Sequence, residues 1–349
     1  MYFQPVKLIS QFKRQKGWLR RQSFKKLRNA FELGVNFERA RISGKPLVAP
    51  YPLSISIEPT TSCNLRCPEC PSGLRSFTRP TGMLEPALFR KLINEVHPWL
   101  TNLTFYFQGE PFLNPNLTEM ISYASAKGIY QTISTNAHYL DPETACQVVH
   151  SGLDHLIISL DGVTQEVYEQ YRVGGKLSKV LEGTKNILEA RKSIGSQSPF
   201  ITLQFLVVKH NEHQIDELKI LASELGVDEL KLKTAQIYNY ENGSPLIPEN
   251  LKYSRYLPDQ NGKWKIRSEW ENKCWKMWSS SVITWDGRVL PCCFDKDAKY
   301  QMGNINQQSF AEIWSGEKYD QFRSAILKSR ADIDICRNCT EGLASASSA

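Results

Sequence analysis

Three cysteines crowd one short segment of this 349-residue chain. They lie at i, i+4 and i+7 in Thr60-Thr-Ser-Cys63-Asn-Leu-Arg-Cys67-Pro-Glu-Cys70. Three thiolates on one loop can bind three irons of a [4Fe–4S] cubane and leave the fourth iron open, which is the position where chemistry takes place. A zinc site would need four ligands and is usually built from pairs of Cys-x-x-Cys. The segment therefore predicts a reactive iron–sulfur cluster held by Cys63, Cys67 and Cys70.

A second group of cysteines lies near the C-terminal end of the sequence. Its members are Cys274, Cys292, Cys293, Cys336 and Cys339. Without an apolar leader, such groups indicate metal ligands in a reducing cytoplasm rather than disulfides. From the spacing alone, a structural zinc site of four cysteines and an iron–sulfur cluster are both open interpretations. Cys146, the ninth cysteine, lies in a predicted helix and is expected to be a buried core thiol.

The elements that must position these cysteines alternate along the chain. Six runs rich in β-branched and aromatic residues predict buried parallel strands at 54–58, 103–108, 130–135, 155–160, 201–208 and 229–233. The helices predicted between them are 86–96, 116–126, 142–151, 176–193 and 212–225, with left-handed caps at Gly128, Gly152 and Gly226. This order predicts an α/β fold, a partial (β/α)6 TIM-like barrel in which the loop of Cys63 follows the first strand.

With Asn64-Leu65-Arg66 inside the cysteine spacing, residues 52–235 resemble the radical S-adenosylmethionine (SAM) superfamily. The resemblance implies that SAM chelates the open iron through its amino and carboxylate groups. It also implies that reductive cleavage of SAM gives a 5′-deoxyadenosyl radical, which abstracts a hydrogen atom from the substrate. A reducing partner such as a flavodoxin or a ferredoxin is implied as well.

The resemblance extends to polar residues at the ends of the later predicted strands. Gln108-Gly-Glu110 is similar to the Gly-Gly-Glu motif of the family, and it implies that Glu110 accepts hydrogen bonds from the SAM amino group. The other implied SAM contacts are Ser134, Asn136, Ser159, Asp161 and Arg172. A guanidinium suits a carboxylate because it forms bidentate hydrogen bonds. Asp161 has the alternative role of holding the turn of its loop.

The second cysteine group resembles the auxiliary-cluster region of the SPASM and shorter twitch families, in the layout of twitch enzymes of the 2-deoxy-scyllo-inosamine dehydrogenase type. The resemblance implies one auxiliary [4Fe–4S] cluster bound by Cys274, Cys292, Cys336 and Cys339. The spacing Gly287-x-x-x-x-Cys292 favours Cys292 over Cys293, since neighbours on a strand point to opposite faces. Such a cluster would transfer an electron rather than bind substrate, which favours an oxidation.

Charge is distributed unevenly along the chain. Residues 1–50 contain twelve Lys or Arg and two Glu, whereas the net charge of the whole chain is only +7. This basic extension is expected to be helical over residues 7–42. It is expected to be either a solvated cap on the barrel or an arm that contacts an anionic membrane surface or an acidic partner. Nucleic acid is not the expected partner. No stretch is apolar enough to span a membrane, and a cytoplasmic protein is expected.

The predicted division of the chain has five parts. They are a basic N-terminal extension 1–50, a barrel 51–236, a connecting loop 237–269, an auxiliary-cluster domain 270–342 and a disordered tail 343–349. About fifty residues before the barrel are too few and too basic for a winged-helix domain that would recognise a peptide.

The leading functional hypothesis is a radical SAM oxidoreductase with two clusters that acts on a small molecule. One alternative is a peptide-modifying maturase. Another, from a different class, is a non-catalytic iron–sulfur or zinc protein. His138, Lys233 and Tyr238 lie near expected strand ends, but their spacing assigns no general base.

Overall fold

Six parallel strands form the centre of the fold in the computed structural model, which describes residues 14–267 and 271–340. They are β1 (Ser54–Ile57), β2 (Asn102–Thr104), β3 (Tyr130–Thr135), β4 (His155–Ser159), β5 (Phe200–Val207) and β6 (Glu229–Thr234). Each strand pairs in parallel with the next. β5 is buried along most of its length, as a strand covered on both faces must be. The predicted parallel α/β order is confirmed.

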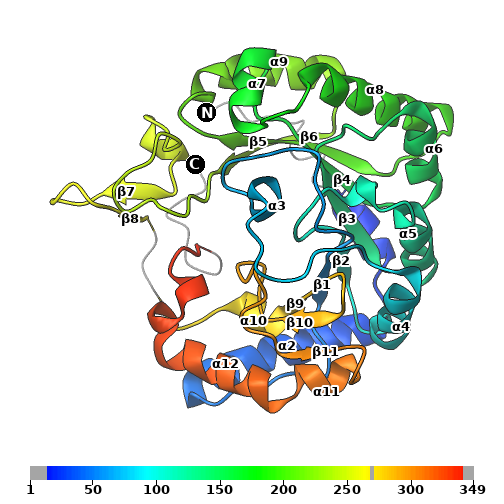
Figure 1. Cartoon of the computed structure of the whole chain (residues 1–349). Helices are drawn as coiled ribbons and strands as arrows, with labels where there is room; N and C mark the ends of the chain where they lie inside the picture. The colour runs from blue at the N-terminus through cyan, green and yellow to red at the C-terminus, as the bar shows by residue number, and fades with distance from the viewer. Residues whose placement is uncertain (1–13, 268–270, 341–349) are drawn as a thin grey trace.

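Helices cover the outer face of the curved sheet (Figure 1). They are α4 (Pro86–Val96), α5 (Leu117–Ala126), α6 (Pro142–His150), α7 (Gln165–Tyr171), α8 (Leu177–Ser193) and α9 (Ile215–Leu225). The short helical turn α3 (Pro71–Leu74) lies inside the curve of the sheet, and the other short turns are η1 (Pro111–Leu113) and η2 (Glu212–Gln214). The five predicted helices are all present. The backbone φ angles of Gly128, Gly152 and Gly226 are 69°, 79° and 74°, which confirms the predicted left-handed caps.

The same sheet continues into the C-terminal part of the chain. β9 (Ser280–Ile283) pairs in parallel with β1, and β10 (Arg288–Leu290) and β11 (Gly303–Asn304) extend it with antiparallel pairs. A turn at 284–288 joins β9 to β10. Helices α10 (Trp275–Ser279), α11 (Phe310–Trp314) and α12 (Glu317–Ser329) and the turns η4 (Arg330–Asp332) and η5 (Asp334–Cys336) complete this part. Because of β9, strand β1 lies inside the sheet rather than at its edge.

The segment between barrel and C-terminal part is more ordered than a connecting loop. It contains η3 (Leu251–Tyr253) and an antiparallel hairpin of β7 (Tyr256–Pro258) and β8 (Trp264–Ile266). Tyr240 stacks on Tyr256 with ring centroids 4.4 Å apart. The prediction of a loop missed this hairpin because each strand has only three residues, too few for an alternating pattern to show.

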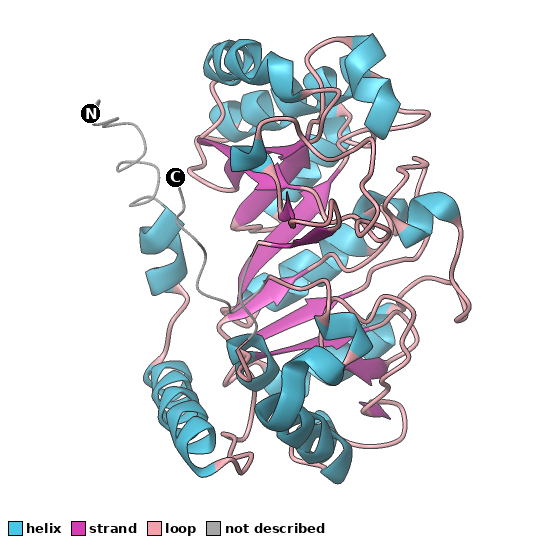
Figure 2. Cartoon of the chain, turned by 90° about the vertical axis from the view of Figure 1, so that its left-hand side faces the viewer, coloured by secondary structure: helices cyan, strands magenta, loops and turns pink. Residues whose placement is uncertain are grey.

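Two helical segments precede the barrel and lie along one side of the molecule (Figure 2). Residues 14–20 are helical, and α2 (Phe24–Ser43) begins after Ser23, whose side chain accepts a hydrogen bond from the Lys26 amide. The single helix predicted over 7–42 is therefore divided at 21–23. The expected start of that helix and the expected disordered tail 343–349 lie outside the described residues. No described helix is both long enough and apolar enough to cross a bilayer.

Candidate cofactor sites and substrate cavity

The three cysteines of the first group meet at the C-terminal edge of the parallel strands. Their loop follows β1, and the thiols of Cys63, Cys67 and Cys70 interact electrostatically with one another. Burial raises the pKa of the Cys63 thiol to about 12 and also raises that of Cys67. Buried thiolates need a positive charge to stabilise them, so their ionisation is coupled to iron binding. This donor set fits a cluster.

The segment 108–110 packs directly on the cysteine loop. The Glu110 amide donates to the Ser62 carbonyl over 2.8 Å, and the Gln108 amide oxygen lies 3.9 Å from the Cys70 sulfur. Gly109 has φ +76°, and a Cβ added there would lie 2.2 Å from the Thr60 carbonyl oxygen. Glycine is therefore required at position 109, whereas Gln108 is accommodated beside the cysteine loop.

The Glu110 carboxylate is buried and held by donors from the end of β3. It accepts hydrogen bonds from the Thr135 hydroxyl at 2.6 Å and the Asn136 amide at 2.8 Å. The Asn136 side chain in turn donates to Asn64, between the first two cysteines, at 2.8 Å. Burial raises the pKa of Glu110, and these hydrogen bonds act in the opposite direction. Glu110 and Asn136 thus lie together beside Cys63.

Asp161 and Arg172 form a second polar pair at the same edge. Arg172 Nε donates to Asp161 at 2.5 Å, and its Nη1 lies 3.8 Å from the Cys67 sulfur. Asp161 also accepts from the Leu206 amide at 2.7 Å, so it orients Arg172 and joins β4 to β5. Ser159 ends β4 and is buried, and Ser134 lies half-buried on β3.

The second cysteine group comes together around Cys274 at the start of α10. Cys292 and Cys336 each interact electrostatically with Cys274, and Cys336 does so with Cys339 as well. Burial raises the pKa of Cys336 to about 12. The buried guanidinium of Arg330 stabilises thiolates in this group, because it donates to the Cys339 sulfur at 3.3 Å. The donor chemistry again fits a cluster.

The two adjacent cysteines interact with each other through a side-chain hydrogen bond. Cys292 also interacts electrostatically with Cys274, and Cys293 also interacts with Lys296. In the described part of the chain, no three His, Cys, Asp or Glu side chains converge closely enough for a single metal ion. A cubane does not require such convergence, because each thiolate binds a different iron.

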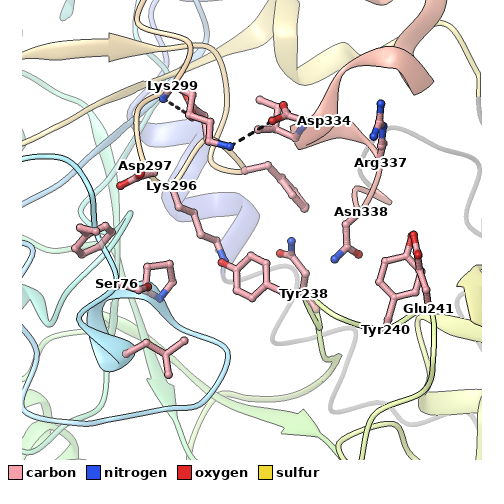
Figure 3. Close-up of a pocket in the computed structure, with 17 residues that line it drawn as sticks. Ser76, Tyr238, Tyr240, Glu241, Lys296, Asp297, Lys299, Asp334, Arg337 and Asn338 are labelled. Atoms are coloured by element: carbon pink, nitrogen blue, oxygen red, sulfur yellow. Dashed lines mark hydrogen bonds and ion pairs between the residues drawn. The ribbon is translucent and has the colours of Figure 1, made fainter.

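A cavity of about 500 Å³ is lined by residues that neighbour both cysteine groups in the sequence (Figure 3). Its walls come from the segment after Cys70, from the segment after Cys293 and from residues around Cys336. The polar lining residues are Ser76, Gln236, Tyr238, Tyr240, Glu241, Asp295, Lys296, Asp297, Lys299, Asp334, Arg337 and Asn338. Lys296 Nζ donates to the Tyr238 hydroxyl at 2.7 Å. Burial lowers the pKa of Lys296 and raises that of Tyr238.

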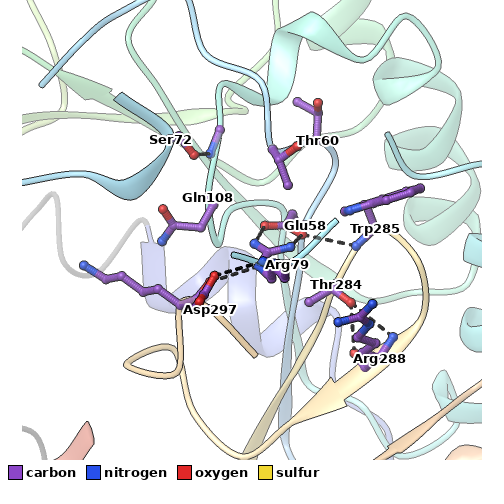
Figure 4. Close-up of polar contacts among 12 residues, drawn as sticks. Glu58, Thr60, Ser72, Arg79, Gln108, Thr284, Trp285, Arg288 and Asp297 are labelled. Atoms are coloured by element: carbon purple, nitrogen blue, oxygen red, sulfur yellow. Dashed lines mark hydrogen bonds and ion pairs between the residues drawn. The ribbon is translucent and has the colours of Figure 1, made fainter. Parts of the chain in front are cut away.

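A buried ion pair ties the wall of this cavity to the barrel (Figure 4). Arg79 donates to both carboxylate oxygens of Glu58, at 3.0 and 2.6 Å, directly after β1. It also donates to the Lys296 carbonyl at 3.0 Å. Asp297 accepts from the backbone amides of Thr78 and Arg79 at 2.8 and 3.3 Å. The segment that follows the cysteine loop is thereby fastened to both parts of the chain.

Comparison with known protein families identifies both the barrel and the C-terminal part of the chain. The profile of the Radical SAM superfamily matches residues 57–221, and that of the SPASM iron–sulfur cluster-binding domain matches residues 274–340. The chain belongs to the radical SAM superfamily. It is an enzyme of that superfamily, and its cofactors are SAM and a [4Fe–4S] cluster. Its SPASM/twitch-type domain binds an auxiliary iron–sulfur cofactor. The sequence-based recognition is confirmed.

Two curated relatives cover most of this radical SAM enzyme. The chain is 28% identical over 308 residues to the tungsten-containing aldehyde ferredoxin oxidoreductase cofactor-modifying protein of Pyrococcus furiosus, covering 76% of this chain and 82% of the relative. It is 26% identical over 308 residues to the PqqA peptide cyclase of Gluconobacter oxydans, covering 82% of each.

Solved structures confirm the fold. SuiB of Streptococcus suis bound to SAM matches with a TM-score of 0.62 and 15% identity, over 90% of this chain and 76% of SuiB. BtrN in complex with SAM and 2-DOIA matches with a TM-score of 0.50 and 20% identity, over 84% of this chain and 94% of BtrN. The shared architecture is the α/β fold described above.

Sequence reasoning missed Lys296, Asp297 and the Glu58–Arg79 pair. A buried ion pair between residues 21 positions apart cannot be predicted from the sequence, because it produces no repeating pattern of residue types. For Lys296 the only signal was its position three residues after Cys293. Of the three residues noted near the expected strand ends, Tyr238 lines the cavity, whereas His138 Nε2 accepts from the Lys176 amide at 2.9 Å and so holds a turn.

Proposed function

We propose that this protein is a radical SAM oxidoreductase that removes two electrons from a small polar substrate bound between its two cysteine groups. The observation that carries the proposal is the cavity of about 500 Å³, which adjoins the segments after Cys70 and after Cys293. Its volume lies within the range of small-molecule sites, about 300–1,000 Å³. A substrate there would lie near both clusters.

The proposed ligands follow the two groups of cysteines. Cys63, Cys67 and Cys70 would hold the SAM-binding cluster, and Cys274, Cys292, Cys336 and Cys339 the auxiliary cluster. The residues proposed to hold SAM are Glu110, Ser134, Asn136, Ser159, Asp161 and Arg172. In this set Asp161 has a positioning role, because its carboxylate is occupied by Arg172 and the Leu206 amide.

When bound, SAM and its cluster supply a radical that abstracts one hydrogen atom, and the auxiliary cluster accepts one electron. Completing a two-electron oxidation then requires that the chain accept one proton. Lys296 lines the cavity and, because burial lowers its pKa, is closer to the neutral amine than a surface lysine. We assign Lys296 as the proton acceptor. Tyr238, whose hydroxyl accepts a hydrogen bond from Lys296 Nζ at 2.7 Å, is its positioning residue.

The cavity also carries charges of both signs for binding a polar substrate. Lys299 and Asp334 form an ion pair at 3.5 Å, and Arg337 and Glu241 lie on the same walls. A substrate that carries hydroxyl and amino groups would find donors and acceptors there. The electron that initiates each turnover would come from a flavodoxin- or ferredoxin-type partner.

The experiment supplies the anaerobic, reconstituted and reduced enzyme with extracts from cells grown in D2O. The proposal expects deuterium in the 5′-deoxyadenosine formed with the small-molecule fraction, and about eight irons per chain for two [4Fe–4S] clusters. Lys296→Met should abolish product but keep formation of 5′-deoxyadenosine. Iron near four per chain would contradict the two-cluster mechanism, and a lack of deuterium transfer from that fraction would contradict the small substrate.

A second candidate is modification of a peptide. The observation in its favour is the likeness to the PqqA peptide cyclase, which extends over 82% of both chains. The same extracts separate the two candidates, because a peptide substrate would transfer deuterium only from the peptide fraction.

A further inference from the structure

We propose that α2 binds the surface of an anionic phospholipid bilayer, with the catalytic face of the barrel turned away from it. The two faces of α2, the charge around them and the position of the helix in the fold support this binding, which does not depend on the identity of the substrate.

The inner face of α2 is anchored to the barrel. Lys26 Nζ donates to the Gly128 carbonyl at 2.7 Å, and Asn29 donates to the Tyr51 carbonyl at 2.9 Å. Phe37 packs edge-on against Trp275 and Trp278, with centroids 5.2 and 5.4 Å away. These contacts fix the rotation of the helix, so the opposite face must point outward.

That outward face is apolar. Phe24, Phe31 and Ile42 are 84%, 74% and 87% exposed, and the stripe also includes Leu27 and Val35. At 100° per residue, Phe24, Phe31, Val35 and Ile42 fall within about 40° of one another on the helix surface. A contiguous apolar stripe on the surface of a protein marks a binding surface, unlike single exposed apolar residues.

The stripe lies in strongly basic surroundings. Residues 14–45 contain ten Lys or Arg and two acidic residues, Glu32 and Glu38. In and directly after the first helical segment, Arg14 and Arg21 pair with Glu229 and Asp154 of the barrel, and Lys16 and Arg20 line the adjoining cavity of about 670 Å³. A helix with an apolar face and basic flanks lies in the interface of an anionic membrane, where both parts are stabilised. Two copies of this chain joined through α2 would instead bring like charges together.

The position of α2 sets the orientation of the enzyme. Gly128 and Tyr51, which accept its hydrogen bonds, directly precede β3 and β1, so α2 covers the N-terminal edge of the parallel strands. The cysteine loop follows β1 at the opposite edge. A bilayer bound to α2 would leave the catalytic edge open to water, and the substrate would arrive from the aqueous side.

The test is co-sedimentation of the full-length, cluster-loaded enzyme with vesicles. We expect binding to phosphatidylcholine vesicles with about 30% phosphatidylglycerol, and at least ~tenfold weaker binding to phosphatidylcholine alone. The triple variant Phe24→Ser, Phe31→Ser, Ile42→Ser should bind the anionic vesicles at least ~tenfold more weakly. Arg39→Gln with Lys45→Gln should also weaken binding about tenfold or more.

Ile220→Ser on α9 is the matched control, because Ile220 is also an exposed apolar helix residue, 61% exposed. It should bind like the parent, and all variants should keep the parent rate of SAM cleavage. Three results would overturn the proposal. They are no binding of the parent to anionic vesicles, unchanged binding of the triple serine variant, and a dimer that the triple variant converts to a monomer without vesicle binding.

Discussion

At the scale of single residues, the adjacent Cys292 and Cys293 are hydrogen-bonded to each other. Cys292, the proposed ligand of the auxiliary cluster, also interacts with Cys274, and Cys293 also interacts with Lys296 at the cavity. We therefore expect Cys292→Ala to lower the iron content from about eight toward four per chain, and Cys293→Ala to leave it near eight. Iron analysis and the absorbance of the clusters measure this. The reverse pattern would exchange the assignments of the two residues.

His155 gives the fold a dependence on pH. It lies at the start of β4, its Nε2 is 2.8 Å from the Thr202 hydroxyl, and burial lowers its pKa from 6.5 to about 3. Below pH 6.5 the unfolded chain takes up a proton that the folded chain does not, so the free energy of unfolding falls as the pH falls. At about pH 5 the loss is roughly 2 kcal/mol.

Urea unfolding of the parent and of His155→Gln at about pH 7.5 and pH 5 measures this effect. The glutamine amide can donate to Thr202 without titrating, so the variant should lose about 2 kcal/mol less than the parent over that interval. Equal losses in both proteins would show that His155 does not carry this part of the pH dependence.

At the scale of elements, the Glu58–Arg79 pair joins β1, the segment after the cysteine loop and the C-terminal part. The side chains of Arg79 and Glu58 are 3% and 0% exposed. Arg79→Met leaves a carboxylate buried without its cation, which costs about 3–5 kcal/mol. Arg90→Met breaks the exposed Arg90–Glu119 pair and should cost less than ~1 kcal/mol. Similar midpoints for both variants in urea would contradict a structural role of the buried pair.

At the scale of the whole molecule, the barrel and the C-terminal part share one sheet. Since β9 pairs with β1 along four residues, removing it would expose β1, with its buried residues Ile55 and Ile57, as an edge. We expect the two parts to unfold together, with coincident urea midpoints by circular dichroism and by cluster absorbance. A chain ending at residue 269 should aggregate. Two separate transitions, or a soluble folded fragment, would contradict this.

The sequence by itself determined the family, the cofactors and the order of the barrel. Cysteine spacing and the polar motifs at strand ends are local signals, since each motif spans only a few positions. Buried parallel strands can also be predicted from the sequence, because both of their faces must be apolar, as in β5. The glycine caps at 128, 152 and 226 were predictable for the same reason, because a left-handed backbone favours one residue type.

Only the tertiary structure decided which distant groups meet. The pairing of β9 with β1, the Glu58–Arg79 pair and the position of Lys296 beside Tyr238 join residues far apart in sequence. The apolar residues of α2 show the same limit. Phe24 and Phe37 are both apolar residues of one helix, yet Phe37 is buried against tryptophans and Phe24 is exposed. Which of the two side chains is buried depends on which face of α2 packs on the barrel. Contacts with residues more than two hundred positions away in the sequence decide this.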